Sequence, residues 1–129
     1  MRHAIIAENA PCPVGPYSQA VAAGNLIFVS GQIGIEPLSN ALMEGIAAQT
    51  RQALKNVAAI LEAAGSGLED VVRADVFVAD MRDFAEVNKI YAEYFSADPK
   101  PARVTCGVRE LPKNALIEIS CIAEAKDHQ

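Results

Sequence analysis

The alternation of apolar and polar positions predicts a chain of short strands interrupted by two helices. Apolar residues recur every three or four positions over 45–64, which indicates an amphipathic helix that Gly65 should end. A second helix, capped by Asp80, is expected to run through Phe95. Alternating or short apolar runs predict strands over 3–7, 19–23, 26–30, 71–79, 103–108 and 115–123.

Two segments interrupt this pattern and are expected to be loops. Residues 8–18 contain three prolines and a glycine, so regular structure is excluded there. Residues 31–40 are the second expected loop, and Gly24-Asn25 predicts a tight hairpin. The order β-β-β-α-β-α-β-β indicates an α+β domain, with a mostly antiparallel sheet and both helices on one face.

The expected strands 71–79 and 115–123 are apolar on both sides. In the first of them, the side that carries Val72 and Ala74 is apolar, and so is the side that carries Phe77. Two helices can cover only one face of a sheet, and a second face this apolar exceeds what a soluble monomer leaves exposed. The sequence therefore predicts that this face packs against other copies of the chain.

Composition narrows the class of protein. The 129 residues fit a single domain over 1–129, and the 51% apolar and 21% charged residues are typical of a globular chain. The formal net charge is −5, and no run of Lys and Arg forms a basic patch. An acidic surface repels phosphate backbones, so a nucleic-acid partner is not expected.

Cysteine and histidine usage restricts the chemistry further. Cys12, Cys106 and Cys121 are odd in number and far apart, which indicates free thiols in a reducing cytoplasm, two of them as small apolar fillers in strands. His3 and His128 stand near the two ends, so neither a serine protease-like triad nor a zinc cluster is expected. Neither a membrane-spanning segment nor a signal peptide is expected.

Two charged residues in the last two expected strands are the strongest candidates for chemistry. Arg103 and Glu118 are both expected on the helix-free face, where neighbouring strands would bring them close. Arginine can bind a carboxylate through two parallel hydrogen bonds, and a glutamate beside it can move protons to or from water. A structural ion pair at a subunit boundary explains the same two residues equally well. Burial would raise the pKa of Glu118 and the arginine would lower it, so the direction stays open.

Three further residues are candidates with ordinary alternatives. Tyr17 follows Gly-Pro in the first loop, where an aromatic lid over the core is the usual role. Gly31 would let a ligand or another chain approach the backbone, although a turn explains it as well. Asn88 interrupts the second helix, where most such residues face solvent or tie the helix to a loop.

Taken together, these segments resemble one family over roughly residues 5–124. The shared motifs are GPYSQAV (15–21), FVSGQI (28–33), QTRQALKNVAAILEAAG (49–65), VFVADMRDFAEVNKIYAEYF (76–95), PAR (101–103) and LPKNALIEISCIA (111–123). The chain is similar to the RidA/YjgF family, the reactive-intermediate deaminases. The resemblance implies a chorismate-mutase-like fold in a cofactor-free homotrimer, with a central barrel of sheets, helices outside and clefts between subunits.

The same resemblance implies a set of site residues. Arg103 would bind the carboxylate of a small 2-imino or 2-amino-2-enoic acid, and Glu118 would hold or activate the attacking water. Neither a metal nor another cofactor is implied. The implied substrate-binding residues are Tyr17, which would line the cleft, Gly31 and Thr105, which would offer backbone contacts, and Asn88, in the surrounding shell.

The implied reaction is hydrolytic deamination of 2-iminopropanoate (2-aminoacrylate) and 2-iminobutanoate to 2-oxo acids and ammonia. Three departures from the common pattern leave the substrate range open: Ser120 replaces a frequent glutamate, Thr105 a frequent cysteine and Asn40 a frequent glycine. The alternatives are a deaminase of aminomuconate or aminoacrylate derivatives in catabolism, an RNA-cleaving or translation-inhibiting relative, and a non-catalytic trimer that binds small acids.

Overall fold

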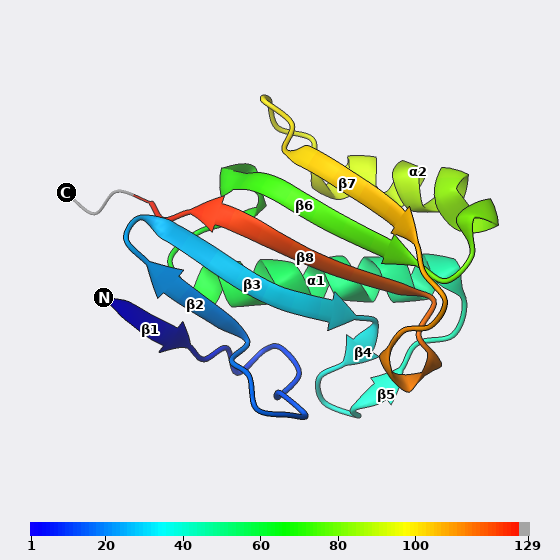
Figure 1. Ribbon diagram of the computed structural model, residues 1–129, viewed down its shortest axis with the longest axis horizontal. Helices are drawn as coiled ribbons and strands as arrows, with labels where there is room; N and C mark the ends of the chain where they lie inside the picture. Colours follow the sequence, from blue (N-terminus) through cyan, green and yellow to red (C-terminus); the bar gives the residue numbers. More distant parts are fainter. Residues whose placement is uncertain (127–129) are drawn as a thin grey trace.

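A computed structural model describes residues 1–126; the last three residues, including His128, lie outside the described part. The chain forms a six-stranded sheet of order β1-β2-β3-β8-β6-β7 and a separate two-stranded β4-β5 hairpin (Figure 1). The elements are β1 Arg2–Ile5, β2 Ala20–Ala23, β3 Leu26–Ile33, β4 Ile35–Glu36, β5 Ala41–Leu42, α1 Ile46–Ala63, β6 Val71–Val78, α2 Phe84–Tyr94, β7 Ala102–Gly107 and β8 Ile117–Glu124.

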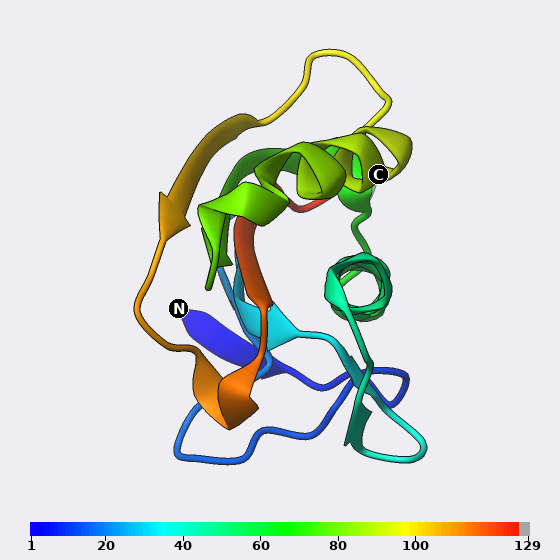
Figure 2. The same cartoon turned by 90° about the vertical axis from the view of Figure 1, so that its right-hand side faces the viewer.

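The arrangement confirms the coarse prediction of a sheet with two helices on one face. Neighbouring strands pair antiparallel except β6 and β7, which are parallel. Parallel neighbours need a long crossover connection, and α2 provides it between β6 and β7. Figure 2, which looks along α1, shows both helices on the same side of the curved sheet. The opposite face carries no helix of the described chain.

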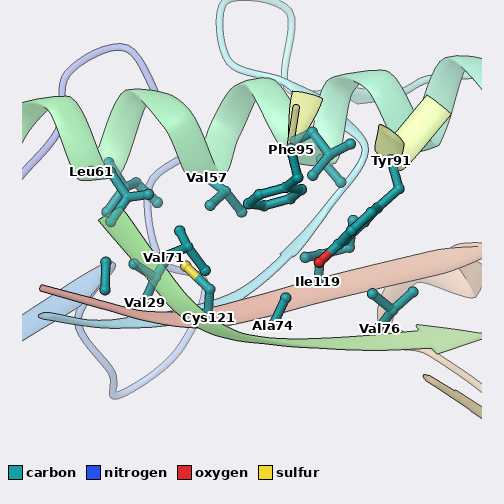
Figure 3. Close-up of a cluster of buried hydrophobic side chains, with 14 of the residues drawn as sticks. Val29, Val57, Leu61, Val71, Ala74, Val76, Tyr91, Phe95, Ile119 and Cys121 are labelled. Atoms are coloured by element: carbon teal, nitrogen blue, oxygen red, sulfur yellow. The ribbon is translucent and has the colours of Figure 1, made fainter. Parts of the chain in front are cut away.

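The core lies between the helices and the sheet (Figure 3). The central part of the apolar stripe of α1 is fully buried there, as the helical period predicted, and consists of Ala53, Leu54, Val57, Ile60 and Leu61. Alternate residues of β8 face the same core, including Ile119 and Cys121, and burial raises the pKa of the Cys121 thiol to about 12. Gly65 ends α1 as expected, with a positive φ of 76° that suits glycine.

The prediction of a loop over 31–40 is wrong. Strand β3 continues to Ile33, and the β4-β5 hairpin occupies most of the remaining segment. The reason is a β-bulge: Val29 pairs with Cys121 and Gln32 with Ile119, so β3 holds one residue more than β8 between those pairs. In the sequence, a glycine such as Gly31 looks like the end of a strand, and for this reason the loop was expected to begin there.

A second bulge corrects the faces of β6. Val71 pairs with Ala123 and Arg73 with Ile122, so one extra residue separates these pairs. Val71 is therefore buried with Ala74, whereas Val72, expected on that same side, is 42% exposed. The second helix also differs from its prediction, because residues 81–83 form a 3₁₀ turn before α2 begins.

The helix-free face carries exposed apolar side chains from several strands. Phe28 of β3 is 42% exposed and Val104 of β7 is 41% exposed. Cys106 is exposed rather than the buried filler that the sequence predicted, because its strand turns it away from the helices. The self-association expected of this face stays a prediction. Within residues 1–126, no helix has the length and apolarity that crossing a bilayer requires.

Candidate functional site

The structure separates the two charged candidates. Strand β6 lies between β7 and β8, so Arg103 and Glu118 are not on neighbouring strands. Arg103 pairs with the buried Ala74 on the helix face, whereas Glu118 pairs with Phe77 on the opposite face. The expectation that both lie on the helix-free face is therefore wrong for Arg103. Alternation within a strand does not reveal which of its two sides meets the helices.

Glu118 lines a small pocket of about 70 Å³. Its walls come from the proline-rich loop, the end of β3 and the 3₁₀ turn over Pro112–Asn114. We call it the Glu118 pocket; it is lined by Pro11, Cys12, Pro13, Val14, Tyr17, Gln19, Gly31, Gln32, Ile33, Ile35, Asn40, Pro112, Lys113 and Glu118. The structure thus brings together Tyr17, Gly31 and Glu118, three of the six predicted site residues.

Gly31 makes room for the glutamate. A Cβ atom at Gly31 would stand 2.5 Å from Glu118 Oε2 and 2.7 Å from its Cδ, closer than real Cβ contacts allow. The carboxylate therefore lies directly over the backbone of the bulge. The sequence suggested a close approach of a ligand or another chain at this glycine; within one chain, the group that approaches it is Glu118.

The carboxylate of Glu118 has no hydrogen-bond or ion-pair partner among residues 1–126. It is half-buried, and this burial raises its pKa above the usual range of a glutamate. The arginine that would have lowered the pKa lies on the other face. A carboxyl group that takes up and releases its proton closer to neutral pH is suited to general acid–base chemistry.

Buried polar contacts hold the Tyr17 loop in place. The Gln19 side chain accepts a hydrogen bond from Ala7 N at 2.7 Å and donates to Pro11 O at 2.9 Å. At the end of the same loop, Ser30 Oγ donates to Ser18 O at 2.6 Å. These contacts hold the irregular loop over 8–18 in place, because its backbone is not paired with a neighbouring strand. Gln19 was missed as a positioning residue, although a glutamine beginning an apolar strand was a signal.

Polar residues of α1 fix the other side of the pocket. Asn56, 1% exposed, donates to Ile33 O at 3.2 Å and Ile35 O at 2.9 Å, where β3 turns into β4. At this corner a Cβ on Gly34 would lie 2.5 Å from Gln49 Cα, so helix and strand touch backbone to backbone. Sequence reasoning missed both residues: it placed Gln49 off the apolar stripe and did not single out Asn56.

A second cluster surrounds Arg103 on the helix face. The guanidinium carbon lies 4.7 Å from the ring centre of Tyr91 and 5.7 Å from that of Phe84. Asn88 stands between these two aromatic residues on α2, one turn after Phe84, and Thr105 follows Arg103 on the same side of β7. We call Phe84, Asn88, Tyr91, Arg103 and Thr105 the Arg103 cluster. It unites the other three predicted site residues.

The Arg103 cluster contains polar atoms without partners. Asn88 Oδ1, Tyr91 Oη and Thr105 Oγ1 are buried and make no hydrogen bond within residues 1–126. Arg103 itself forms neither a hydrogen bond nor an ion pair there. Burial raises the pKa of Tyr91, although the nearby Arg103 opposes this. Unsatisfied polar groups around a cation are typical of a site that is completed by another molecule.

The two groups of residues offer complementary chemistry. A free guanidinium can bind a carboxylate, and an unpaired carboxyl with a raised pKa can transfer protons. Since they lie on opposite faces of one sheet, one chain cannot apply both to one ligand. Larger hollows of about 360 and 470 Å³ contain neither Arg103 nor Glu118. Within residues 1–126, no group of three or more His, Cys, Asp or Glu side chains is placed to hold a metal ion.

Comparison with known proteins places the chain among relatives of nearly its own length. A RutC family protein of Pyrococcus horikoshii is 54% identical, over 95% of this chain and 98% of that protein. A protein of Salmonella typhimurium named 2-iminobutanoate/2-iminopropanoate deaminase is 46% identical, over 95% of this chain and 98% of that protein.

Solved structures share the fold at high sequence identity. The YjgF gene product of E. coli matches with a TM-score of 0.91 and 45% identity, over 96% of this chain and 99% of that one. A structure described as a putative endoribonuclease of Thermotoga maritima matches with a TM-score of 0.93 and 44% identity, over 98% and 100%. A family model described as endoribonuclease L-PSP covers residues 7–125. This chain therefore belongs to the RidA/YjgF family, to which the L-PSP description also applies.

Proposed function

We propose that this protein is a cofactor-independent deaminase that hydrolyses small 2-imino and 2-enamino acids to 2-oxo acids and ammonia. The observation that carries the proposal is that Arg103 and Glu118 each lack a protein partner within residues 1–126. Their opposite faces exclude an ion pair between Arg103 and Glu118 within one chain, so the competing explanation, a structural ion pair at a subunit boundary, would have to join two copies. Relatives named as reactive-intermediate and 2-iminobutanoate deaminases support the assignment.

The active site would form between copies of the chain. Arg103 on the helix side of the edge strand β7 and Glu118 on the helix-free face can meet if two copies pack with unlike faces. We propose a cytoplasmic homotrimer with a central barrel, in which the exposed apolar side chains of the helix-free face become buried. Each cleft would then combine the Arg103 cluster of one copy with the Glu118 pocket of the next.

The proposed reaction needs few protein groups. Arg103 binds the substrate carboxylate, which fixes the C2 carbon relative to the opposite wall of the cleft. Glu118 removes a proton from water as the water oxygen bonds to C2 of the imine, and the same proton passes to the imine nitrogen as the C=N double bond becomes a single bond. In the resulting carbinolamine, Glu118 takes the hydroxyl proton and returns it to the amino nitrogen as the C2–N bond breaks, so ammonia leaves and the 2-oxo acid remains. Proton transfer by a positioned glutamate contributes about two to four powers of ten in rate.

A coupled assay tests this proposal. A threonine or serine dehydratase generates the imine, and semicarbazide traps what has not been hydrolysed. The protein should lower the trapped fraction and speed formation of the 2-oxo acid. Arg103→Ala should remove the effect, whereas Arg51→Ala, which removes an exposed arginine paired with Glu93, should not. An unchanged rate in Arg103→Ala would remove Arg103 from the mechanism. Larger imino acids in the same assay test the catabolic alternatives.

RNA cleavage is the second candidate, favoured by the description of the family model and by the name of the Thermotoga structure. The net charge of −5 opposes it, because nucleic-acid binding depends on neutralising phosphates. A gel assay with structured RNA and the Arg103→Ala variant separates the two activities. Binding of 2-oxo acids without any turnover would instead support a trimer that only binds small acids.

A further inference from the structure

We propose that the rings of Phe84 and Tyr91 are positioning residues that hold the Arg103 guanidinium ready for a carboxylate ligand. The inference deepens the proposed function and rests on it in taking a carboxylate as the ligand. It assigns a role to two aromatic residues of α2 that were not among the candidate site residues of the sequence.

The geometry is that of a cation held over two ring faces. The guanidinium carbon lies 4.7 Å from the centre of the Tyr91 ring and 5.7 Å from that of the Phe84 ring. Both distances are within the range in which the negative face of an aromatic ring attracts a cation. The two residues stand seven positions apart on α2, so they occupy one stripe of the helix, and the guanidinium spans it.

The Tyr91 ring is fixed by its surroundings. Its side chain is 9% exposed, and its ring centre lies 4.5 Å from that of Phe95. Figure 3 shows the ring reaching from α2 toward the sheet, within the core and beside Ile119. This packing restricts the ring, so an arginine that packs on it loses part of its own conformational freedom before a ligand arrives. A ligand then binds without the cost of ordering that side chain.

Aromatic packing also leaves the hydrogen-bond donors of Arg103 free. Arg51 shows the contrast, because both of its terminal nitrogens donate to Glu93, at 2.7 and 3.2 Å. Arg73 and Arg82 likewise donate to aspartates. Arg103 has no carboxylate partner within residues 1–126, and a ring face consumes none of its N–H groups. The planar edge that matches a carboxylate therefore stays open.

The experiment measures binding rather than turnover. Calorimetry gives the dissociation constants of 2-oxobutanoate and of 2-oxobutanamide, which lacks the carboxylate, for the assembled protein and its variants. The ratio of the two constants is the carboxylate selectivity. Wild-type protein should prefer the acid strongly. Tyr91→Leu and Phe84→Leu should each lower this selectivity about tenfold by weakening acid binding, with the amide little changed.

Matched variants separate positioning from structural damage. Tyr91→Phe keeps the ring and should restore the selectivity that Tyr91→Leu loses. Tyr94→Leu removes an aromatic residue of α2 that lines a different hollow, and should leave selectivity unchanged. In an Arg103→Ala background, Tyr91→Leu should have no further effect on acid binding, because the group that it positions is gone.

Several results would overturn the inference. Equal weakening of acid and amide in Tyr91→Leu would show general damage to the site, and unchanged selectivity would show that the rings do not act through Arg103. If Tyr91→Leu does not fold, the half-buried Phe84 decides by the same criterion. A wild-type protein that binds acid and amide alike would also overturn it. Carboxylate selectivity that depends on Arg103, without any imine hydrolysis, would contradict the proposed function but would still support the positioning role of the two rings.

Discussion

At the residue scale, the position of Glu118 depends on a missing side chain. A Cβ at Gly31 would stand 2.5 Å from the carboxylate oxygen, so the glutamate lies where only glycine leaves room. Burial in the same place raises its pKa. The position of the Glu118 carboxyl group and its raised pKa thus both come from this one local arrangement. The position can be tested by substituting Gly31, and the pKa by varying the pH.

The Gly31→Ala variant should keep its fold and lose activity. The clash is with the movable end of a side chain, so Glu118 can rotate away at little cost in stability. A misplacement of about 1 Å in a catalytic group can lower the rate about a hundredfold, so kcat/KM should fall by roughly ten- to a hundredfold. Gly67→Ala is the control, because its Cβ would displace Glu69, which lies outside the Glu118 pocket. Unchanged kcat/KM in Gly31→Ala would contradict this reading.

The raised pKa of Glu118 predicts the acid side of the pH profile. The deprotonated carboxylate activates water, so kcat/KM should fall as the pH is lowered through a pKa above the usual glutamate range. The folded chain also binds this proton more tightly than the unfolded chain does. Its free energy of unfolding should therefore decrease as the pH rises from the usual glutamate pKa through the raised one. Four other carboxyl groups with lowered pKa values act in the opposite direction, so the effect is measured as a difference: the free energy of unfolding of wild type minus that of Glu118→Gln, from denaturant titrations, should decrease over this pH range.

At the scale of elements, α1 does more than cover the sheet. Its buried Gln49 donates to Met43 O at 2.9 Å and accepts from Leu116 N at 2.8 Å, so one side chain ties the helix to two segments beside the pocket. Asn56 does the same for the corner between β3 and β4. Buried polar groups that are fully satisfied specify one arrangement of the elements around them.

Gln49→Leu should destabilise the chain by about 2 kcal/mol. The substitution leaves a backbone carbonyl and a backbone N–H without their partners, and each unsatisfied buried group costs about 1–3 kcal/mol, partly offset by the apolar side chain. Chemical denaturation measures the loss. Lys55→Ala, at an exposed position of the same helix, should change the stability by less than about 0.5 kcal/mol. Equal effects of the two would show that the Gln49 bridge is not important.

Periodicity predicted the elements well because local patterns determine them. The alternation of β8 and the central part of the apolar stripe of α1 are confirmed, although the buried Gln49 and Asn56 were not expected on the buried side of the helix. The two bulges were missed, since an inserted residue leaves no mark in a pattern of period two. The side of β7 was also missed: nothing local tells whether Arg103 or Val104 faces the helices. The relation between Arg103 and Glu118 depends on β6 lying between their strands, which is a property of the whole sheet.

At the scale of the molecule, the site is divided between two faces. The Arg103 cluster lies under α2 and the Glu118 pocket lies on the helix-free face, so the proposed active site is complete only in an assembly. Exposed apolar residues such as Phe28 and Val104 offer the surface for that assembly. Because the two residues lie on different faces, the assembly can be tested by measuring activity as well as by measuring the molecular mass of the protein in solution.

Mixing two inactive variants should restore activity. Arg103→Ala and Glu118→Gln assemblies should each be inactive in the coupled assay. After subunit exchange at equal amounts, a cleft is intact when one copy supplies Arg103 and its neighbour supplies Glu118, so about a quarter of wild-type activity should return. A sample mixed without exchange should stay inactive. No recovery after verified exchange would contradict an active site that combines Arg103 of one copy with Glu118 of its neighbour.

The bulge in β3 has a consequence for how the chain tolerates deletion. Without Gly31, Ser30 alone would oppose Ser120, and Gln32 and Ile33 would keep both their present partners and their present sides. The ladder itself thus gains nothing from the additional residue. A chain without Gly31 is expected to fold with regular strand pairing, but it would lack the glycine backbone against which the Glu118 carboxylate now packs.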